Sequence, residues 1–336
     1  MPESVLFLAV IVAVALAFDF TNGAHDSANA IATVVSTKVL SPRTAVLMAA
    51  VLNLVGAFLG TEVAQTIGSG IVQADMVKGC QALTLSALMG AIAWNVFTWY
   101  LGLPSSSSHA LIGGLIGSAL AYRGPSSLHV ASILEKVVLP LVFSPLAGFA
   151  AGYLLMLALS WGLRNSHPGR VNSVFRRLQI LSSAFMATSH GTNDAQKTMG
   201  VITLALFAGH HIPGMVVPDW VKVACALAMA FGTAMGGWKI VKTMGHRIFK
   251  MEPVHGFSAE TAAASVIFAA SHFGAPISTT HTISASILGV GASKRLSAVR
   301  WGIAGSMVTA WVLTIPATAV MGALSFIVLD VVGLAK

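Results

Sequence analysis

A polar octapeptide occurs twice in this chain, each time inside an apolar stretch long enough to cross a membrane. The first copy, NGAHDSAN, begins at Asn22, and the second, HGTNDAQK, begins at His190, 168 residues later. Both copies have glycine at the second position and aspartate at the fifth. Because an ionised side chain within a span costs about 3 kcal/mol on insertion scales, such residues are usually functional. The motif therefore predicts a membrane protein with a functional centre inside the bilayer.

Two further pairs of segments indicate that the chain is an internal repeat. GAFLG at Gly56 matches GTAMG at Gly232, and LGLPSSSSH matches FGAPISTTH, which aligns Pro104 with Pro276. Three features in the same order at nearly constant offset indicate a gene duplication. We interpret GAFLG and GTAMG as patterns for close helix packing. The predicted division is a first membrane repeat at 1–163, a basic cytoplasmic linker at 164–177 and a second membrane repeat at 178–336.

The composition excludes a cytosolic enzyme and a disordered protein. Of the 336 residues, 56% are hydrophobic and 9% are charged, whereas a soluble domain is about 25% charged. The length allows roughly ten membrane segments of about 20 residues. Positive charge in membrane proteins collects in cytoplasmic loops, so the net charge of +8 does not indicate a nucleic-acid partner. We expect the lipid bilayer to be the environment of most of the chain.

The fold class we predict is an all-α polytopic membrane protein, an inverted-topology repeat with broken helices and two re-entrant hairpins. A helix over residues 4–38 would overshoot a bilayer of about 30 Å, so a break or a long interfacial extension is expected at the motif. Re-entrant hairpins at Pro104 and Pro276 give each half three crossings, which inverts the halves. With both termini outside, 13 of the 19 basic residues face inward, as the positive-inside rule requires.

The two motif copies predict a cation site. Asp26 and Asp194 need a partner or a water-filled cavity within the membrane, and glycine can free carbonyls as further ligands. Asn53 is equally well explained by an interhelical hydrogen bond. Asp19 has no counterpart in the second half, and either an ion-binding or a capping role is open for it. The candidate cation ligands are Asn22, Asp26, Asn29, Asn53, Asn193 and Asp194.

The paired hairpin sequences predict an anion site. Proline followed by several hydroxyls is typical of a turn and the N-cap of a new helix, whose free N–H groups and dipole attract anions. Two such tips from inverted repeats can converge on one tetrahedral anion. His109 and His281 either donate to the anion or lock the hairpins by hydrogen bonds. The candidate substrate ligands are Ser105, Ser106, Ser107, Ser108, His109, Lys197, Ser278, Thr279, Thr280 and His281.

With its paired motifs, the PSSSSH and PISTTH tips and GGWKIVKTMG at Gly236, the chain resembles the inorganic phosphate transporter (PiT) family, most closely its compact bacterial members. The resemblance covers nearly the whole chain. It implies a scaffold part and a mobile part, a homodimer, and phosphate uptake with Na⁺ or H⁺ or as a neutral metal–phosphate complex. Asn22, His25 and His190 depart from the GANDxAN-like motif of the family, which leaves the exact cation ligands open.

The function we predict is secondary active uptake of phosphate across the cell (inner) membrane by alternating access, without a cofactor other than the coupling ion. The alternative is a sulfate or other oxyanion permease of the same family. Phosphate keeps a proton that Asp26 or Asp194 can accept, whereas sulfate has none and would be repelled. An intramembrane hydrolase would need metal-ligand spacing such as HExxH, which the sequence lacks. A passive anion channel would not need buried aspartates. We therefore expect a transporter, with neither a catalytic site nor a resident metal site.

Overall fold

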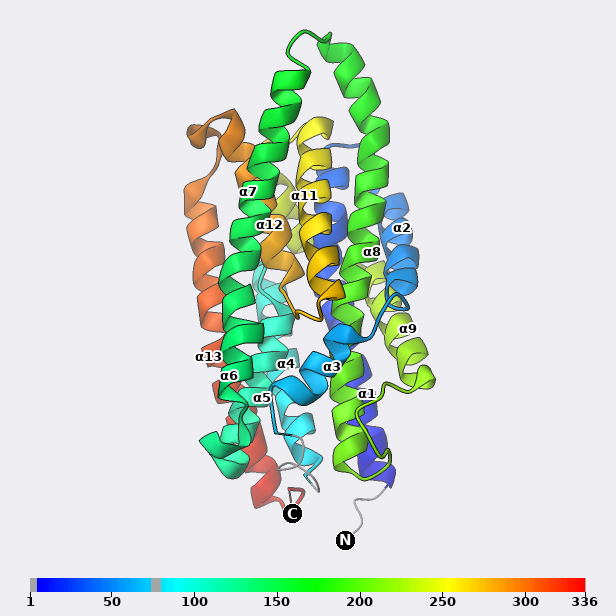
Figure 1. Cartoon of the computed structure of the whole chain (residues 1–336), viewed down its shortest axis with the longest axis vertical. Helices are drawn as coiled ribbons and strands as arrows, with labels where there is room; N and C mark the ends of the chain where they lie inside the picture. Colours follow the sequence, from blue (N-terminus) through cyan, green and yellow to red (C-terminus); the bar gives the residue numbers. More distant parts are fainter. Residues whose placement is uncertain (1–4, 74–79, 336) are drawn as a thin grey trace.

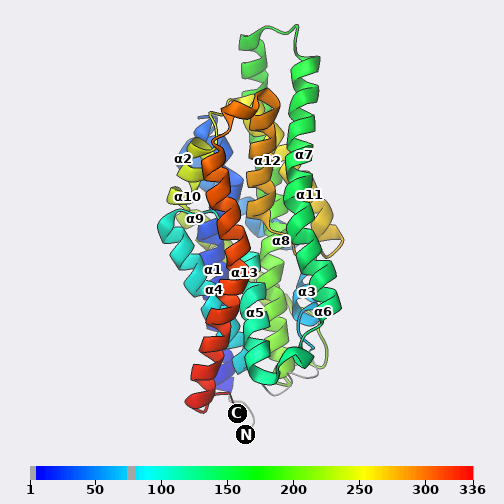
Figure 2. The same cartoon turned by 90° about the vertical axis from the view of Figure 1, so that its left-hand side faces the viewer.

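The chain folds into an elongated bundle of helices that run mostly along one axis (Figures 1 and 2). The computed structural model describes residues 5–73 and 80–335. The helices in chain order are α1 (Val5–Ser36), α2 (Pro42–Gly56), α3 (Glu62–Gly70), α4 (Ala82–Leu101), α5 (Ser107–Arg123), α6 (Val130–Ile133), α7 (Leu139–Gly162), α8 (Pro168–Ala208), α9 (Asp219–Met235), α10 (Trp238–Lys242), α11 (Pro253–His272), α12 (Thr279–Lys294) and α13 (Trp301–Val331). Over the described ranges no strand forms, and the predicted all-helical fold is confirmed.

Several of these helices have the length and composition of membrane spans. They are α1, α4, α13 and the continuous helix Val130–Gly162, in which a π-helical stretch joins α6 to α7. The pair Asp219–Met235 and Trp238–Arg247 passes the same test as one span bent by 59°. Large apolar side chains on the bundle surface, such as Phe143 of α7 and Val312 of α13, are exposed, as lipid-facing residues are. The chain is therefore a multi-pass membrane protein.

The two halves of the chain interlock. Helix α5 of the first half packs against α13 of the second, and α12 of the second packs against α7 of the first. In the same exchanged manner, α1 packs against α9 and α8 against α2. Helices α4 and α5 lie toward the end of the bundle where α1 begins, and α11 and α12 lie toward the opposite end (Figures 1 and 2). Residues 164–177, predicted as a linker, form the turn between α7 and α8 and the first turns of α8.

The helices that carry the polar motifs are unbroken, so the predicted breaks at these positions are wrong. Helices α1 and α8 continue through both motifs, and α8 instead extends to 41 residues, projecting with α7 beyond the rest of the bundle (Figure 1). A Cβ on Gly23 would lie 2.4 Å from the carbonyl oxygen of Met229, and one on Gly191 would lie 2.2 Å from that of Asn53. The motif glycines therefore allow close helix contact and do not unwind the backbone.

Helix breaks occur elsewhere, at the two short glycine patterns. They separate α2 from α3 and α9 from α10. Within the patterns, a Cβ on Gly56 would lie 2.2 Å from the carbonyl oxygen of Thr188, and one on Gly232 would lie 2.0 Å from that of Phe20. No side chain larger than hydrogen fits at such a distance, so the predicted packing role of GAFLG and GTAMG is confirmed.

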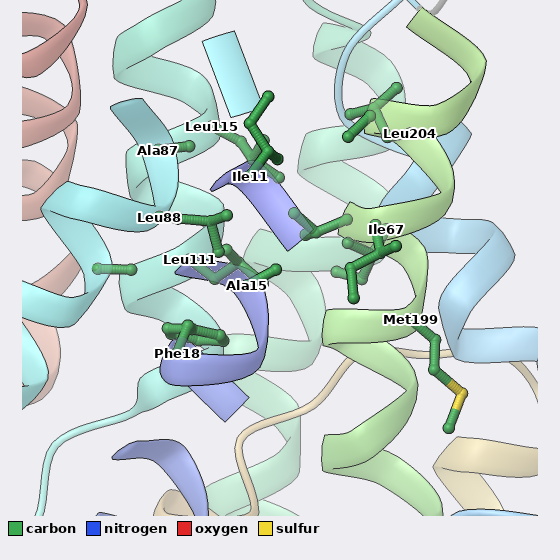
Figure 3. Packing of buried hydrophobic residues seen from close by; sticks show 14 of the residues in the cluster. Ile11, Ala15, Phe18, Ile67, Ala87, Leu88, Leu111, Leu115, Met199 and Leu204 are labelled. Carbon is green, nitrogen blue, oxygen red and sulfur yellow. The ribbon is translucent and has the colours of Figure 1, made fainter. Parts of the chain in front are cut away.

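Across residues 5–73 and 80–335, the apolar core consists of two clusters, one toward each end of the bundle. The first joins α1, α3, α4, α5, α8 and α9, and Figure 3 shows part of it, with Ile11 and Phe18 of α1 near Leu88 and Leu111. The second joins the later turns of α1 to α2, α8, α10, α11 and α12. Between the clusters, α1 buries the polar residues of its motif. The candidate site therefore lies in a polar layer with packed apolar side chains on both sides.

Candidate functional site

The two motif copies meet at one buried centre, because α1 packs against α8 at the level of both motifs. The side chains of Asp26 and Asp194 are 2% and 0% exposed. Asp26, His190 and Asp194 each offer one ligand atom, and these three atoms lie within 4.8 Å of one another. Two carboxylates and an imidazole at this spacing can hold a cation between the two halves of the chain.

Asp194 is the most heavily bonded carboxylate of this centre. Lys197 Nζ lies 2.5 Å from its Oδ1, and its Oδ2 accepts a hydrogen bond of 3.1 Å from Thr279 Oγ1. His190 Nε2 lies 3.2 Å from the same Oδ2. Lys197 Nζ also donates to Ser108 Oγ at 2.5 Å and to the carbonyl oxygen of Ile277 at 2.9 Å. Lys197 therefore joins α8 to both hairpin tips.

Asp26 has a different set of neighbours. His25 Nδ1 lies 2.6 Å from its Oδ1, which also accepts a hydrogen bond of 3.2 Å from Thr280 Oγ1. Asn29 Nδ2 donates to the same Thr280 hydroxyl at 2.9 Å. On the other side of the imidazole, His25 Nε2 lies 3.2 Å from Thr98 Oγ1, next to the first hairpin tip. The carboxylate thus contacts one tip directly and the other through His25.

Both hairpin tips begin a helix with a capped N-terminus, as predicted. Ser106 Oγ accepts a hydrogen bond from the backbone N–H of His109, and Ser278 Oγ accepts one from that of His281, each at 3.2 Å. The preceding N–H groups of the first turn have no acceptor within their own helix. These tips add the positive ends of two helix dipoles to the polar layer. The centre can therefore attract an anion and a cation together.

His109 and His281 bring the two hairpins into direct contact. Their ring centroids are 4.9 Å apart, and His281 stacks on Trp311 with centroids 4.2 Å apart. Within the described part of the chain, both ring nitrogens of His281 and the Nδ1 atom of His109 have no hydrogen-bond partner. The two imidazole rings therefore hold the hairpins together by packing against each other and against Trp311.

The asparagines of the predicted cation set are not all at the centre. Asn53 Nδ2 donates to Thr233 Oγ1 at 2.9 Å, and Asn53 Oδ1 lies 3.0 Å from His190 Nδ1, so Asn53 orients the imidazole. Asn193 Nδ2 donates to Ser271 Oγ at 2.8 Å, which ties α8 to α11. Asn22 is buried in α1, and within the described residues its Oδ1 atom has no partner.

Two further carboxylates are buried: Glu260, which was not identified from the sequence, and Asp19, whose role the sequence left open. Glu260 is fully buried in α11, where Thr33 and Ser182 donate to it and Gln179 donates at 3.3 Å. Glu260 is the one Asp, Glu, Lys or Arg residue of α11, and this isolated charge is the signal that could have identified it. Asp19 is also fully buried, and among the described residues neither of its carboxylate oxygens has a hydrogen-bond partner.

Comparison with known proteins finds phosphate transporters by family model, by sequence and by structure. A family model described as the phosphate transporter family matches residues 22–322. Two proteins described as a probable low-affinity inorganic phosphate transporter are similar along nearly their whole length. That of Bacillus subtilis is 47% identical, covering 98% of this chain and 99% of the relative, and that of Rhizobium meliloti is 50% identical, covering 97% of each. A solved structure described as the sodium-dependent phosphate transporter superposes with a TM-score of 0.85 at 25% identity, covering 97% of this chain and 99% of its own.

Proposed function

Because the chain belongs to the phosphate transporter family, we propose that it is a secondary active transporter that takes up inorganic phosphate. The family and these relatives are transporters and not enzymes, and the apolar helices fit a multi-pass protein of the plasma membrane. The observation that carries the proposal is the meeting of two helix N-termini, a buried lysine and two buried aspartates in one polar layer.

The anion binds between the two hairpin tips in this proposal. The first-turn N–H groups of α5 and α12 and the hydroxyls of Ser105–Ser108 and Ser278–Thr280 supply hydrogen-bond donors. Lys197 supplies a positive charge, and its contacts with Ser108 and Ile277 support a position between the tips. The hydroxyls of Thr279 and Thr280 donate hydrogen bonds to Asp194 and Asp26. When phosphate enters, a phosphate oxygen replaces the carboxylate as the acceptor of these two hydroxyls.

The coupling cation, Na⁺ or H⁺, binds beside the anion. The supporting geometry is the close approach of Asp26, His190 and Asp194. Asn29 hydrogen-bonds to both tip threonines, at 3.2 and 2.9 Å, which couples the cation ligands to the anion ligands. Asn22, Asn53 and Asn193 complete the proposed set, the last two by orienting groups around it. The same carboxylate and imidazole ligands suit a divalent ion, so uptake of a neutral metal–phosphate complex is the second candidate.

Transport follows an alternating-access cycle. The site residues are buried, and each apolar cluster separates them from one end of the bundle. When one cluster opens at a time, the site becomes accessible first from one side of the membrane and then from the other. We propose that residues 1–163 and 178–336 are inverted repeats with re-entrant hairpins at α4–α5 and α11–α12, that 164–177 is cytoplasmic, that both termini lie outside, and that the protein is a homodimer. The packing of each hairpin helix against the last helix of the other half supports the repeat assignment.

Uptake by proteoliposomes tests the substrate and the coupling ion together. Labelled phosphate and labelled sulfate are offered separately, with Na⁺ and H⁺ gradients imposed one at a time and with or without a divalent-metal chelator. We expect phosphate uptake that one cation gradient drives and that sulfate does not inhibit. Sulfate uptake that phosphate fails to inhibit would refute the substrate assignment, and loss of uptake on chelation alone would favour the metal–phosphate complex.

A further inference from the structure

Among the positions at which the two motif copies differ, one adds a permanent charge to the polar centre. With the offset of 168 residues that aligns the motifs, Asp26 corresponds to Asp194, and Asn29 corresponds to Lys197. Both residues stand three positions after their aspartate, on the same face of a continuous helix. One half therefore has an amide where the other half has a permanent positive charge.

Lys197 is coordinated by oxygen atoms as a bound cation would be. Its Nζ atom contacts Asp194 Oδ1 at 2.5 Å, Ser108 Oγ at 2.5 Å and the carbonyl oxygen of Ile277 at 2.9 Å. An ammonium group has three hydrogen-bond donors, so these contacts use all of them. The side chain is 1% exposed. A carboxylate, a hydroxyl and a backbone carbonyl from three separate segments are also the ligands that a hard monovalent cation selects.

Within the part of the chain that the structure describes, Asp26 has no comparable internal cation. Asn29 turns its amide toward Thr279 and Thr280, at 3.2 and 2.9 Å, and contributes no net charge. The neighbouring group of Asp26 is His25, at 2.6 Å, whose charge depends on its protonation. Among the aligned motif residues, with neutral histidines, the carboxylates of Asp26 and Asp194 and the ammonium of Lys197 leave one negative charge uncompensated, and that charge belongs to the half without lysine.

We infer that Lys197 is a built-in cation that takes the place of a coupling ion at Asp194. Of the two motif aspartates, only Asp26 then binds a mobile cation, and the transporter loads one coupling ion fewer for each phosphate than a centre with asparagine in both halves. This inference rests on the proposed function, because it presupposes that cation binding promotes phosphate binding. It differs from a simple anion-ligand role for Lys197, which would change phosphate affinity and leave the number of coupled ions unchanged.

The number of cations linked to phosphate binding tests this inference. Binding of labelled inorganic phosphate to the purified transporter is measured while Na⁺ is replaced by choline at fixed pH, and again while pH is varied at fixed Na⁺ with the ionisation of phosphate subtracted. Below saturation by the cation, each linked ion makes phosphate binding tenfold weaker for a tenfold lower cation concentration. For the natural protein, we expect phosphate binding to weaken tenfold when the cation concentration is lowered tenfold.

Two variants provide the decisive comparison. Lys197→Asn gives the second half the asparagine of the first. For this variant we expect phosphate binding to weaken a hundredfold when the cation concentration is lowered tenfold, because a second mobile ion is then required. Asn29→Lys copies the second half, and we expect phosphate binding that no longer depends on the cation. Equal cation dependence in all three proteins would overturn the inference and leave the proposed function intact. If neither variant folds, the natural protein decides alone, since a hundredfold change there contradicts a single mobile ion. No dependence on either cation in the natural protein would refute both the inference and the proposed coupling.

Discussion

Neutralising Asp194 should destabilise the folded protein before any effect on transport is considered. In Asp194→Asn, the Lys197 ammonium stays buried with only uncharged acceptors, which are the new amide oxygen, the Ser108 hydroxyl and the Ile277 carbonyl. Removing one partner of a buried ion pair costs about 3–5 kcal/mol. At about 2 °C of melting temperature for each kcal/mol in a chain of this size, we expect melting to fall by about 6–10 °C.

The second substitution Lys197→Met removes the stranded charge. Because methionine has a similar length and no charge to solvate, we expect the double variant to recover to within about 2 °C of the natural protein. Melting in detergent can be followed with a thiol-reactive dye, since both cysteines, Cys80 and Cys225, are buried in the folded state. This comparison separates the cost of the unpaired charge from the loss of the pair.

A matched control exists at the surface of the bundle. Asp219 and Lys222 form an ion pair with the same three-residue spacing, at 2.9 Å, but the Asp219 side chain is 94% exposed. Water solvates both groups, so Asp219→Asn should not shift melting measurably. Melting of Asp194→Asn within 2 °C of the natural protein, or a double variant as unstable as the single one, would refute the assignment of a buried ion pair.

Three further predictions concern the packing and the hydrogen bonds around the site. Gly23→Val places a side chain against the backbone of α9 and should cost about 1–3 kcal/mol, seen as lower melting, whereas Gly302→Ala, with open space around it, should melt like the natural protein. Ser278→Ala removes the N-cap of α12 and should cost about 1 kcal/mol and raise the KM for phosphate, whereas an unchanged KM would contradict a role for this tip in anion binding. Glu260→Gln replaces an acceptor of three hydrogen bonds with a mixed donor and acceptor, and should cost about 1–3 kcal/mol of stability; unchanged melting would argue against this network.

The helical membrane fold and the capped hairpin tips could be predicted because their causes are local. An apolar run predicts a helix by itself, and the hydroxyls of Ser106 and Ser278 cap the helices that begin directly after them. The pairing of the motifs was equally visible, because the repeat preserves the order of its segments. These properties depend on neighbouring residues along the chain and need no knowledge of tertiary contacts.

Whether the motif helices break or continue at the motifs could not be predicted, because glycine is compatible with both. The same residue type permits unwinding and permits close packing, and only the position of α9 against Gly23 and of α2 against Gly191 decides between them. Glu260 was overlooked for a similar reason. Its partners Thr33 and Ser182 lie in α1 and α8, far away in the sequence, so its charge alone gave no indication of burial.

The most direct test of the account is phosphate accumulation at equal phosphate concentrations. Proteoliposomes contain the same concentration of labelled phosphate inside and outside, and an inward cation gradient is imposed. The account predicts that internal phosphate rises above the external concentration, and that Asp26→Asn abolishes this rise. Phosphate that never exceeds its external concentration under any cation gradient, or an Asp26→Asn variant that accumulates it equally well, would contradict cation-coupled transport at this centre.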